Sequence, residues 1–73
     1  MNELTMNLKT DSKVPLYEQI YNYIKSDIQN GRISYGEKLP STRALARHLE
    51  IIRSTAELAY EQLLSEGYIE SEP

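Results

Sequence analysis

The sequence contains no cysteine, which excludes both a disulfide framework and a thiolate metal site. It also lacks any apolar run approaching the roughly 20 residues that span a bilayer as a helix. The opening residues, MNELTMNLKTDSK, do not show the basic and then apolar order of a secretory signal peptide. These absences predict a soluble protein of the cytoplasm without a membrane partner.

Length and charge limit the kind of site that the chain can build. Its 73 residues form one small domain, and a domain near this size buries only about 60% of the surface that its unfolded chain exposes. We therefore expect a flat or protruding functional surface. The formal net charge of −3 argues against a strongly cationic clamp around a nucleic acid, but a local positive patch could still contact one. Residues 1–13 are polar and unpatterned and are expected to form a flexible tail, which leaves residues 14–73 as the domain.

Side chains suited to catalysis are scarce, and an enzyme is not expected. His48 is the only histidine, and no cysteine or clear carboxylate partner accompanies it, so a surface histidine is the expectation. The six tyrosines could in principle stack on nucleobases. Those that lie on apolar stripes are expected to pack in the core instead: Tyr17, Tyr21 and Tyr60.

An apolar stripe with helical spacing begins after Pro15, a residue that suits a helix entrance. Asn30 and Gly31 supply a stop, because glycine accepts the left-handed conformation that ends many helices. The pattern predicts a first helix over residues 16–30. Its stripe has four members, spaced by four residues: Leu16, Ile20, Ile24 and Ile28.

Two shorter helices are predicted after the connector GRISYGEKLP. Ser41 is a good N-cap, and it opens a second helix over residues 41–49. The apolar pattern breaks at residues 50–52 and resumes in a third helix over residues 53–66, which Gly67 ends. The inward face of the third helix has helical spacing: Ala56, Ala59, Tyr60, Leu63 and Leu64.

Two short strands are also predicted. Residues 38–39 could form a very short strand at the end of the connector, and residues 68–71 look like the start of another. The chain stops at Pro73, before a partner strand could return. The fold class expected from these patterns is mostly α.

The second and third helices, joined by a three- or four-residue turn, describe a helix-turn-helix. In that motif the first residues of the second helix of the pair meet base edges and phosphates in the major groove. Here these residues are Arg53, Ser54 and Thr55. Arginine can bind guanine with two hydrogen bonds or clamp a phosphate, hydroxyl groups can reach phosphate oxygens, and free amides at a helix start attract anions. The outward face of this helix is expected to comprise Ser54, Thr55, Leu58 and Gln62.

Spacing alone leaves other interpretations open, because many small three-helix domains contain such a pair of helices. Arg43 and Arg47 could belong to a solvated helix face. Arg53 and the two hydroxyl residues after it could be a helix start with capping potential. The charge is nevertheless segregated, with four of the eight lysines and arginines in residues 36–55 and five of the acidic residues after them.

Three segments, PLYEQIYNYI, GEKLPSTRALARHL and RSTAELAYEQLLSEGYIES, closely resemble the N-terminal winged-helix domain of the GntR family of bacterial transcription regulators. The resemblance covers residues 11–73, with the motifs in the family's order and spacing. PSTRALA and AYEQLLSEGY look most like the MocR subfamily. Members of that group carry a large C-terminal domain with the fold of pyridoxal-phosphate-dependent aminotransferases. The resemblance implies a DNA-binding fragment without a cofactor of its own, pyridoxal phosphate belonging to a further domain.

The resemblance implies a three-helix winged helix-turn-helix with a short, truncated β-wing, whose tip would begin after Pro73. Arg43 matches the arginine of the family's PS-x-R block, and Arg53 matches the arginine at the front of the recognition helix. The partner implied is double-stranded operator DNA, and because helix-turn-helix regulators usually read two half-sites, the full-length protein is expected to be a homodimer. The residues expected to contact DNA are Ser41, Arg43, Arg53, Ser54 and Thr55.

The turn departs from the family pattern. The family commonly has Gly-Val-Ser or Gly-Val-Thr before the front arginine, where this chain has Glu50, Ile51 and Ile52. Ile51 fits the buried valine position. Ile52 replaces the hydroxyl residue that caps the helix and touches phosphate. It could lie at the boundary between protein and DNA, or it could pack under the turn.

A rival interpretation belongs to a different class of function. A winged helix can serve as a protein-interaction module that uses its third helix or its wing as a docking face. Leu58, expected to be exposed, and the acidic second half of the third helix favour that alternative. Titration with duplex DNA at low and moderate salt separates the two functions, because phosphate contacts make affinity strongly salt-dependent.

Overall fold

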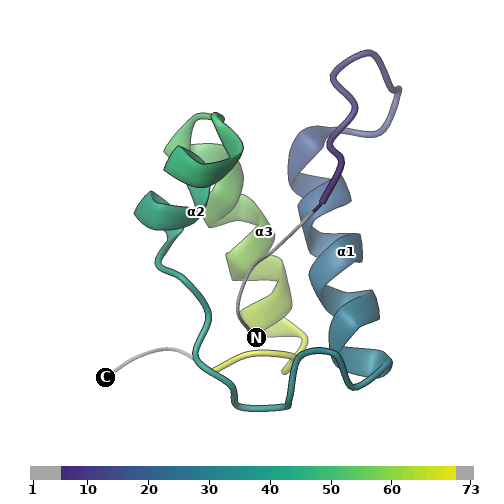
Figure 1. Cartoon of the computed structure of the whole chain (residues 1–73), viewed down its shortest axis with the longest axis vertical. Coiled ribbons are helices and arrows are strands. Elements are labelled where there is room, and N and C mark those ends of the chain that lie inside the picture. The colour runs from purple at the N-terminus through teal and green to yellow at the C-terminus, as the bar shows by residue number, and fades with distance from the viewer. Residues whose placement is uncertain (1–5, 71–73) are drawn as a thin grey trace.

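The computed structural model describes residues 6–70 and contains three helices, α1 (Leu16–Gln29), α2 (Thr42–Leu49) and α3 (Arg53–Ser65). The three predicted helices are confirmed, and each was predicted one residue too long, at a position that proves to be a cap. α3 packs against both α1 and α2, as Figure 1 shows. None of the helices within residues 6–70 has the length and apolar character that crossing a bilayer requires.

The core lies where α1 and α2 meet α3. Ala56 and Ala59 of α3 are completely buried, and such small side chains let the neighbouring helices approach closely. Ile33 of the connector is also buried and belongs to the same core, and Figure 1 shows the connector running below the helices. The other large, fully buried side chains come from all three helices: Ile20, Ile24, Leu45 and Leu63.

The three helices end in the same way, with a residue at positive φ just after the last turn. At the ends of α1 and α3 this residue is glycine, Gly31 or Gly67, but at the end of α2 it is Glu50, with φ of 58°. The amide of Ile51 then donates to the carbonyl of Ala46 at 3.0 Å, the bond of a Schellman motif. This motif folds the chain back into the turn and packs Ile51, which is partly buried, against the core.

Neither predicted strand forms within residues 6–70. Residues 38–39 and 68–70 have no ladder partner in this part of the chain, and Ser71 lies outside the described residues. A strand needs a neighbouring strand to satisfy its backbone groups. The prediction of strands at these positions is therefore wrong for the residues that the structure describes, although the mostly α fold class is confirmed.

The segment before α1 lies against that helix instead of extending away from it. Gln19 accepts a 2.8 Å hydrogen bond from the Lys9 amide, and its own amide group donates to the carbonyls of Lys9 and Val14. Met6 and Leu8 pack against the core. Of the tail expected to be flexible, residues 6–13 are thus tied to α1 by one side chain, whereas residues 1–5 lie outside the described residues.

Candidate nucleic-acid interface

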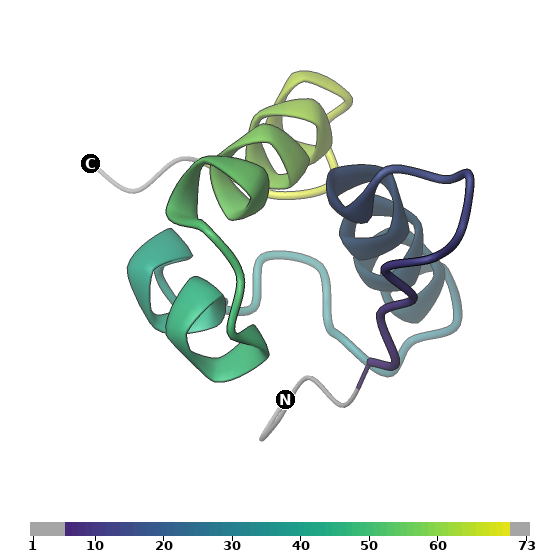
Figure 2. The ribbon, with the colours of Figure 1, turned by 90° about the horizontal axis from the view of Figure 1, so that it is seen from above.

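α2 and α3 form a helix-turn-helix, with residues 50–52 as the turn. Figure 2, seen from above, places α1 and α2 on different sides of α3, so the front of α3 lies beside α2 and away from the bulk of α1. Three of the basic residues of the chain lie on these two helices, and all are exposed: Arg43, Arg47 and Arg53. The geometry brings the two arginines implicated by the resemblance onto one helix pair.

The start of α2 is capped by the side chain predicted to cap it. Ser41 has an extended backbone, and its Oγ accepts a 3.1 Å hydrogen bond from the Ala44 amide. The hydroxyl proton of Ser41 remains available for an anion, because the cap uses only an acceptor lone pair. Ser41 therefore caps α2, and because the residue is exposed, its hydroxyl can still donate a hydrogen bond to a ligand.

The start of α3 is built differently. Ile52 occupies the N-cap position, and its side chain caps no amide of α3 within the described chain. That side chain is 70% exposed, so the interpretation in which Ile52 packs under the turn is wrong. Arg53 and Ser54 are exposed, whereas Thr55 is partly buried. A helix start without a side-chain cap presents amide groups and the positive end of the helix dipole to solvent.

The outward face of α3 differs from the one expected. Gln62 is partly buried, and its side-chain amide donates to Glu66 at 3.2 Å. Helical spacing from Ser54 selects positions i+3, i+4 and i+7. The exposed stripe that results consists of Ser54, Glu57, Leu58 and Glu61, so two carboxylates replace Thr55 and Gln62 on this face.

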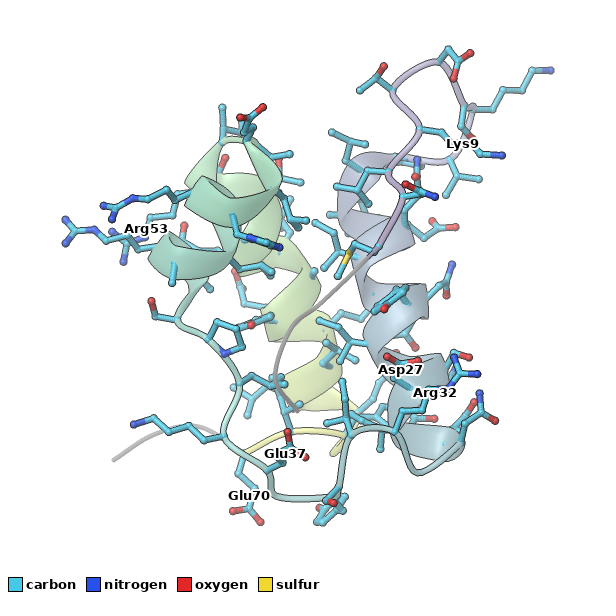
Figure 3. All side chains as sticks on the ribbon, in the orientation of Figure 1. Lys9, Asp27, Arg32, Glu37, Arg53 and Glu70 are labelled. Atoms are coloured by element: carbon cyan, nitrogen blue, oxygen red, sulfur yellow. The ribbon has the colours of Figure 1, made fainter. Side chains whose placement is uncertain are left out.

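Arg53 is paired within its own helix. Its Nε lies 3.5 Å from Oε2 of Glu57, and both side chains are largely exposed. Figure 3 shows Arg53 on the side of the molecule opposite Lys9, pointing away from the helices. The front arginine therefore lies within salt-bridge distance of a carboxylate that was not expected at the site, although the i, i+4 spacing predicts such a contact.

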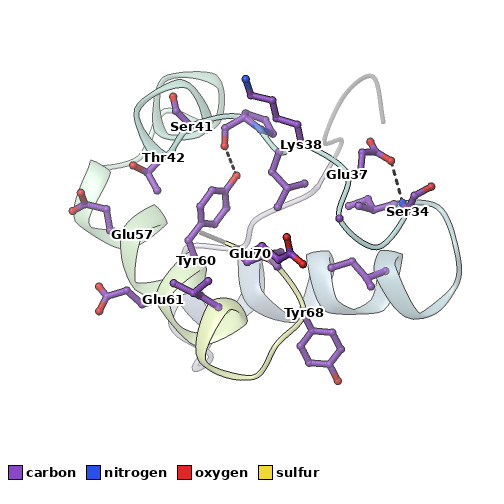
Figure 4. A pocket seen from close by; sticks show the side chains of 17 residues that line it. Ser34, Glu37, Lys38, Ser41, Thr42, Glu57, Tyr60, Glu61, Tyr68 and Glu70 are labelled. Carbon is purple, nitrogen blue, oxygen red and sulfur yellow. Dashed lines mark hydrogen bonds between the residues drawn. The ribbon is translucent and has the colours of Figure 1, made fainter. Parts of the chain in front are cut away.

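A cavity of about 640 Å³ lies below the start of α2. Its lining comes from the connector, from α3 and from residues 68–70, with Tyr60 near its centre (Figure 4). Leu39 and Ile69 contribute apolar surface, whereas Glu57 and Glu61 lie along the α3 side. Among residues 6–70, no group of three potential ligands is placed to hold a metal ion.

Comparison with known proteins agrees with this geometry. The model of the gntR family of bacterial regulatory proteins matches residues 16–73. The chain is 49% identical over 71 residues to the uncharacterized HTH-type transcriptional regulator YdeL of Bacillus subtilis, covering 97% of this chain and 15% of that protein. It is 38% identical over 64 residues to the probable rhizopine catabolism regulatory protein MocR of Rhizobium meliloti, covering 88% of this chain and 13% of that protein.

A solved structure gives the same result. YtrA from Sulfolobus acidocaldarius, a GntR-family transcription factor, superposes with a TM-score of 0.86 at 38% identity, covering 90% of this chain and 70% of that one. The chain spans only 15% of the length of YdeL, so the match concerns one domain of a larger relative. On the strength of the family model and these relatives, the chain belongs to the gntR family of bacterial regulatory proteins.

Proposed function

We propose that the chain is the sequence-specific DNA-binding domain of a bacterial transcription regulator, with α3 in the major groove of operator DNA. The observation that carries the proposal is the front of α3, which combines an exposed arginine with a helix start that lacks a side-chain cap in the described chain. Such a start attracts anions, and arginine recognises both guanine and phosphate. The fold of a DNA-binding family presents that start beside α2.

The proposed contacts follow the exposure of each residue. Arg53 reaches base edges or a phosphate from the front of α3, and Ser54 donates to a phosphate. Arg43 and Ser41 contact the sugar–phosphate backbone of the DNA from the start of α2. Thr55 is partly buried, so it contacts DNA through its backbone amide or through the exposed part of its side chain.

The experiment that tests the proposal replaces Arg43 and Arg53 with alanine, one at a time. A lost phosphate contact lowers affinity evenly across sequences and reduces the slope of log affinity against log salt by about one. A lost bidentate base contact removes about 1–3 kcal/mol of discrimination. Lys9→Ala is the matched control, because it removes a positive charge from the other side of the molecule (Figure 3). Unchanged affinity in both arginine variants contradicts the proposed interface.

The wider context of the domain is proposed on the same basis. We propose a cytoplasmic regulator that acts as a homodimer, is not an enzyme in this domain and belongs to the MocR subfamily, in which pyridoxal phosphate binds a further domain. The MocR protein of Rhizobium meliloti, 38% identical over 64 residues, supports the subfamily. The apolar stripe of α1 lies in the domain's own core, so it is not free to form a dimer. Sedimentation of residues 1–73 should therefore give a monomer. A stable dimer at micromolar concentration would contradict this expectation.

A protein-interaction module is the second candidate. Leu58 is 51% exposed on the outward stripe of α3, and the carboxylates of Glu57 and Glu61 flank it. An apolar side chain between carboxylates suits a basic partner surface better than a phosphate backbone. Affinity for duplex DNA that is absent at low salt favours this second function.

A further inference from the structure

The stripe of α3 that faces outward carries a carboxylate next to its front arginine. Arg53 Nε and Glu57 Oε2 are 3.5 Å apart, with side chains 57% and 47% exposed. An exposed pair at this spacing adds little to helix stability, because solvent screens it. Its effect is larger in a complex with DNA, where the interface excludes the screening solvent, and there the pair influences the direction in which the guanidinium points.

The placement of the pair is poor for the helix itself. Arginine at the first position of α3 lies at the positive end of the helix dipole, and no acidic residue accompanies it in the first turn. An arginine four residues before a glutamate is also the less favourable order of an i, i+4 pair. Local rules that fail together at one place indicate a functional site.

We propose that Glu57 is a specificity-determining positioning residue: it holds Arg53 toward base edges and disfavours binding through phosphates alone. The inference rests on the proposed DNA-binding function. The contact with Glu57 is made on the Nε side of Arg53, at 3.5 Å, which leaves the four N–H groups on its two terminal nitrogens for the two acceptors of guanine in the major groove. Arg53 can thus recognise guanine without giving up its contact with Glu57.

Binding to a phosphate alone has the opposite effect on the pair. When Arg53 turns toward the DNA backbone, the Glu57 carboxylate stays on the outward stripe, close to the polyanion and without its partner. The repulsion that results falls on non-specific complexes, in which arginine side chains rest on phosphates. Discrimination then comes partly from weakening the wrong complex.

Glu61 provides a matched comparison. It lies one turn further along the same exposed stripe, and Figure 4 shows both carboxylates on the same side of α3. In the part of the chain that the structure describes, the salt bridge to Arg53 comes from Glu57 and not from Glu61. Glu57→Gln and Glu61→Gln therefore remove the same charge, but only the first frees Arg53.

The experiment uses the 73-residue chain and two duplexes of equal length. One is the sequence that the parent protein enriches from a random duplex pool, and the other is a scrambled version of it. Glu57→Gln should lower the ratio of the two affinities by about tenfold, chiefly by tighter binding to the scrambled duplex, and should steepen its salt slope by about one. Glu61→Gln should change both affinities by the same factor and leave the ratio unchanged.

A double-mutant cycle with Arg53→Ala tests the path of the effect. If Glu57 acts through Arg53, Glu57→Gln leaves the ratio unchanged in the Arg53→Ala background. The inference is overturned if Glu57→Gln leaves the ratio at the parent value, if Glu61→Gln lowers it equally, or if the effect survives without Arg53. A parent protein that enriches no duplex contradicts the proposed function itself, and that outcome is seen before any variant is compared.

Discussion

Tyr60 donates a 2.7 Å hydrogen bond from its hydroxyl to the backbone carbonyl of Pro40, twenty residues earlier in the chain. The bond ties the middle of α3 to the residue that precedes the N-cap of α2 (Figure 4). Burial raises the pKa of Tyr60 to about 12, so the phenol keeps its proton and donates at neutral pH. The position of Arg43 in the first turn of α2 therefore depends on a contact made by α3.

We predict that Tyr60→Phe lowers the free energy of unfolding by about 1–2 kcal/mol, because the ring stays while the Pro40 carbonyl loses its donor. Urea denaturation measures the change. Tyr35→Phe is the control, since Tyr35 is 67% exposed and its hydroxyl can bond to water in either state. Because the folded pKa is raised, the contribution of Tyr60 is complete below about pH 10 and is lost as the pH rises through about 12. Equal stability of Tyr60→Phe and the parent at neutral pH contradicts the assigned role.

Glu50 adopts a backbone conformation that suits glycine. Its φ of 58° is the only positive value at a residue other than glycine within residues 6–70. A side chain in the left-handed region costs roughly 1–2 kcal/mol. Glycine avoids this cost, but part of the gain is lost because glycine has greater conformational freedom in the unfolded chain. We predict that Glu50→Gly raises the free energy of unfolding by roughly 0.5–1 kcal/mol, seen as a higher melting temperature. Glu50→Ala removes the carboxylate but keeps Cβ, so a gain in that variant as well would show that charge and not backbone strain is responsible.

The stability of the contact between α1 and α3 should fall in acid. Glu66 accepts hydrogen bonds from the Tyr21 hydroxyl and, at 3.2 Å, from Gln62, and these bonds lower the pKa of Glu66 below its ordinary value of 4.5, the Tyr21 bond having the larger effect. A carboxyl group whose pKa is lower in the folded state than in the unfolded state stabilises the protein at pH values above its unfolded-state pKa. This contribution is lost as the pH falls through the folded-state pKa. We predict that Glu66→Gln lowers the melting temperature at neutral pH and has a progressively smaller effect as the pH is lowered below 4.5. Glu61→Gln, on the same helix, should show no such difference; if it does, the effect is one of general charge.

Local patterns in the sequence were sufficient for the helices. The Ser41 cap was predicted from residue type and confirmed, and the i, i+4 stripe of α1 correctly placed Ile20 and Ile24 in the core. The same reasoning failed for Leu64, which is 41% exposed although it was assigned to the inward face of α3. Leu64 borders the cavity below α2, where the described chain provides too little surface to cover it.

Contacts between distant segments could not be predicted in this way. Ile33 stands among polar residues of the connector, and nothing in its neighbourhood marks it as buried. The bonds from Tyr60 to Pro40 and from Tyr21 to Glu66 join residues that no helical period relates. At the candidate interface the DNA contacts stay a prediction, and the Arg53–Glu57 pair was missed because the outward stripe was drawn through Thr55 and Gln62 instead of through Glu57.

Substitutions of Ile52 test whether the missing side-chain cap at the start of α3 affects DNA binding or only the stability of the helix. Its side chain is 70% exposed, so replacing it leaves no cavity in the core. A serine at this position accepts a hydrogen bond from a backbone amide of the first turn, a contribution of typically about 1 kcal/mol. Its hydroxyl proton can then donate to a phosphate.

We therefore predict that Ile52→Ser raises both the melting temperature and the affinity for non-specific duplex DNA. Ile52→Ala separates the causes, because it removes the same apolar side chain without supplying a cap or a donor, and it should gain neither. A serine variant that melts lower than the parent would mean that its hydroxyl does not cap α3. A variant that melts higher but binds DNA no more tightly would mean that the start of α3 contacts no phosphate. That result would contradict the proposed docking of α3 in the major groove.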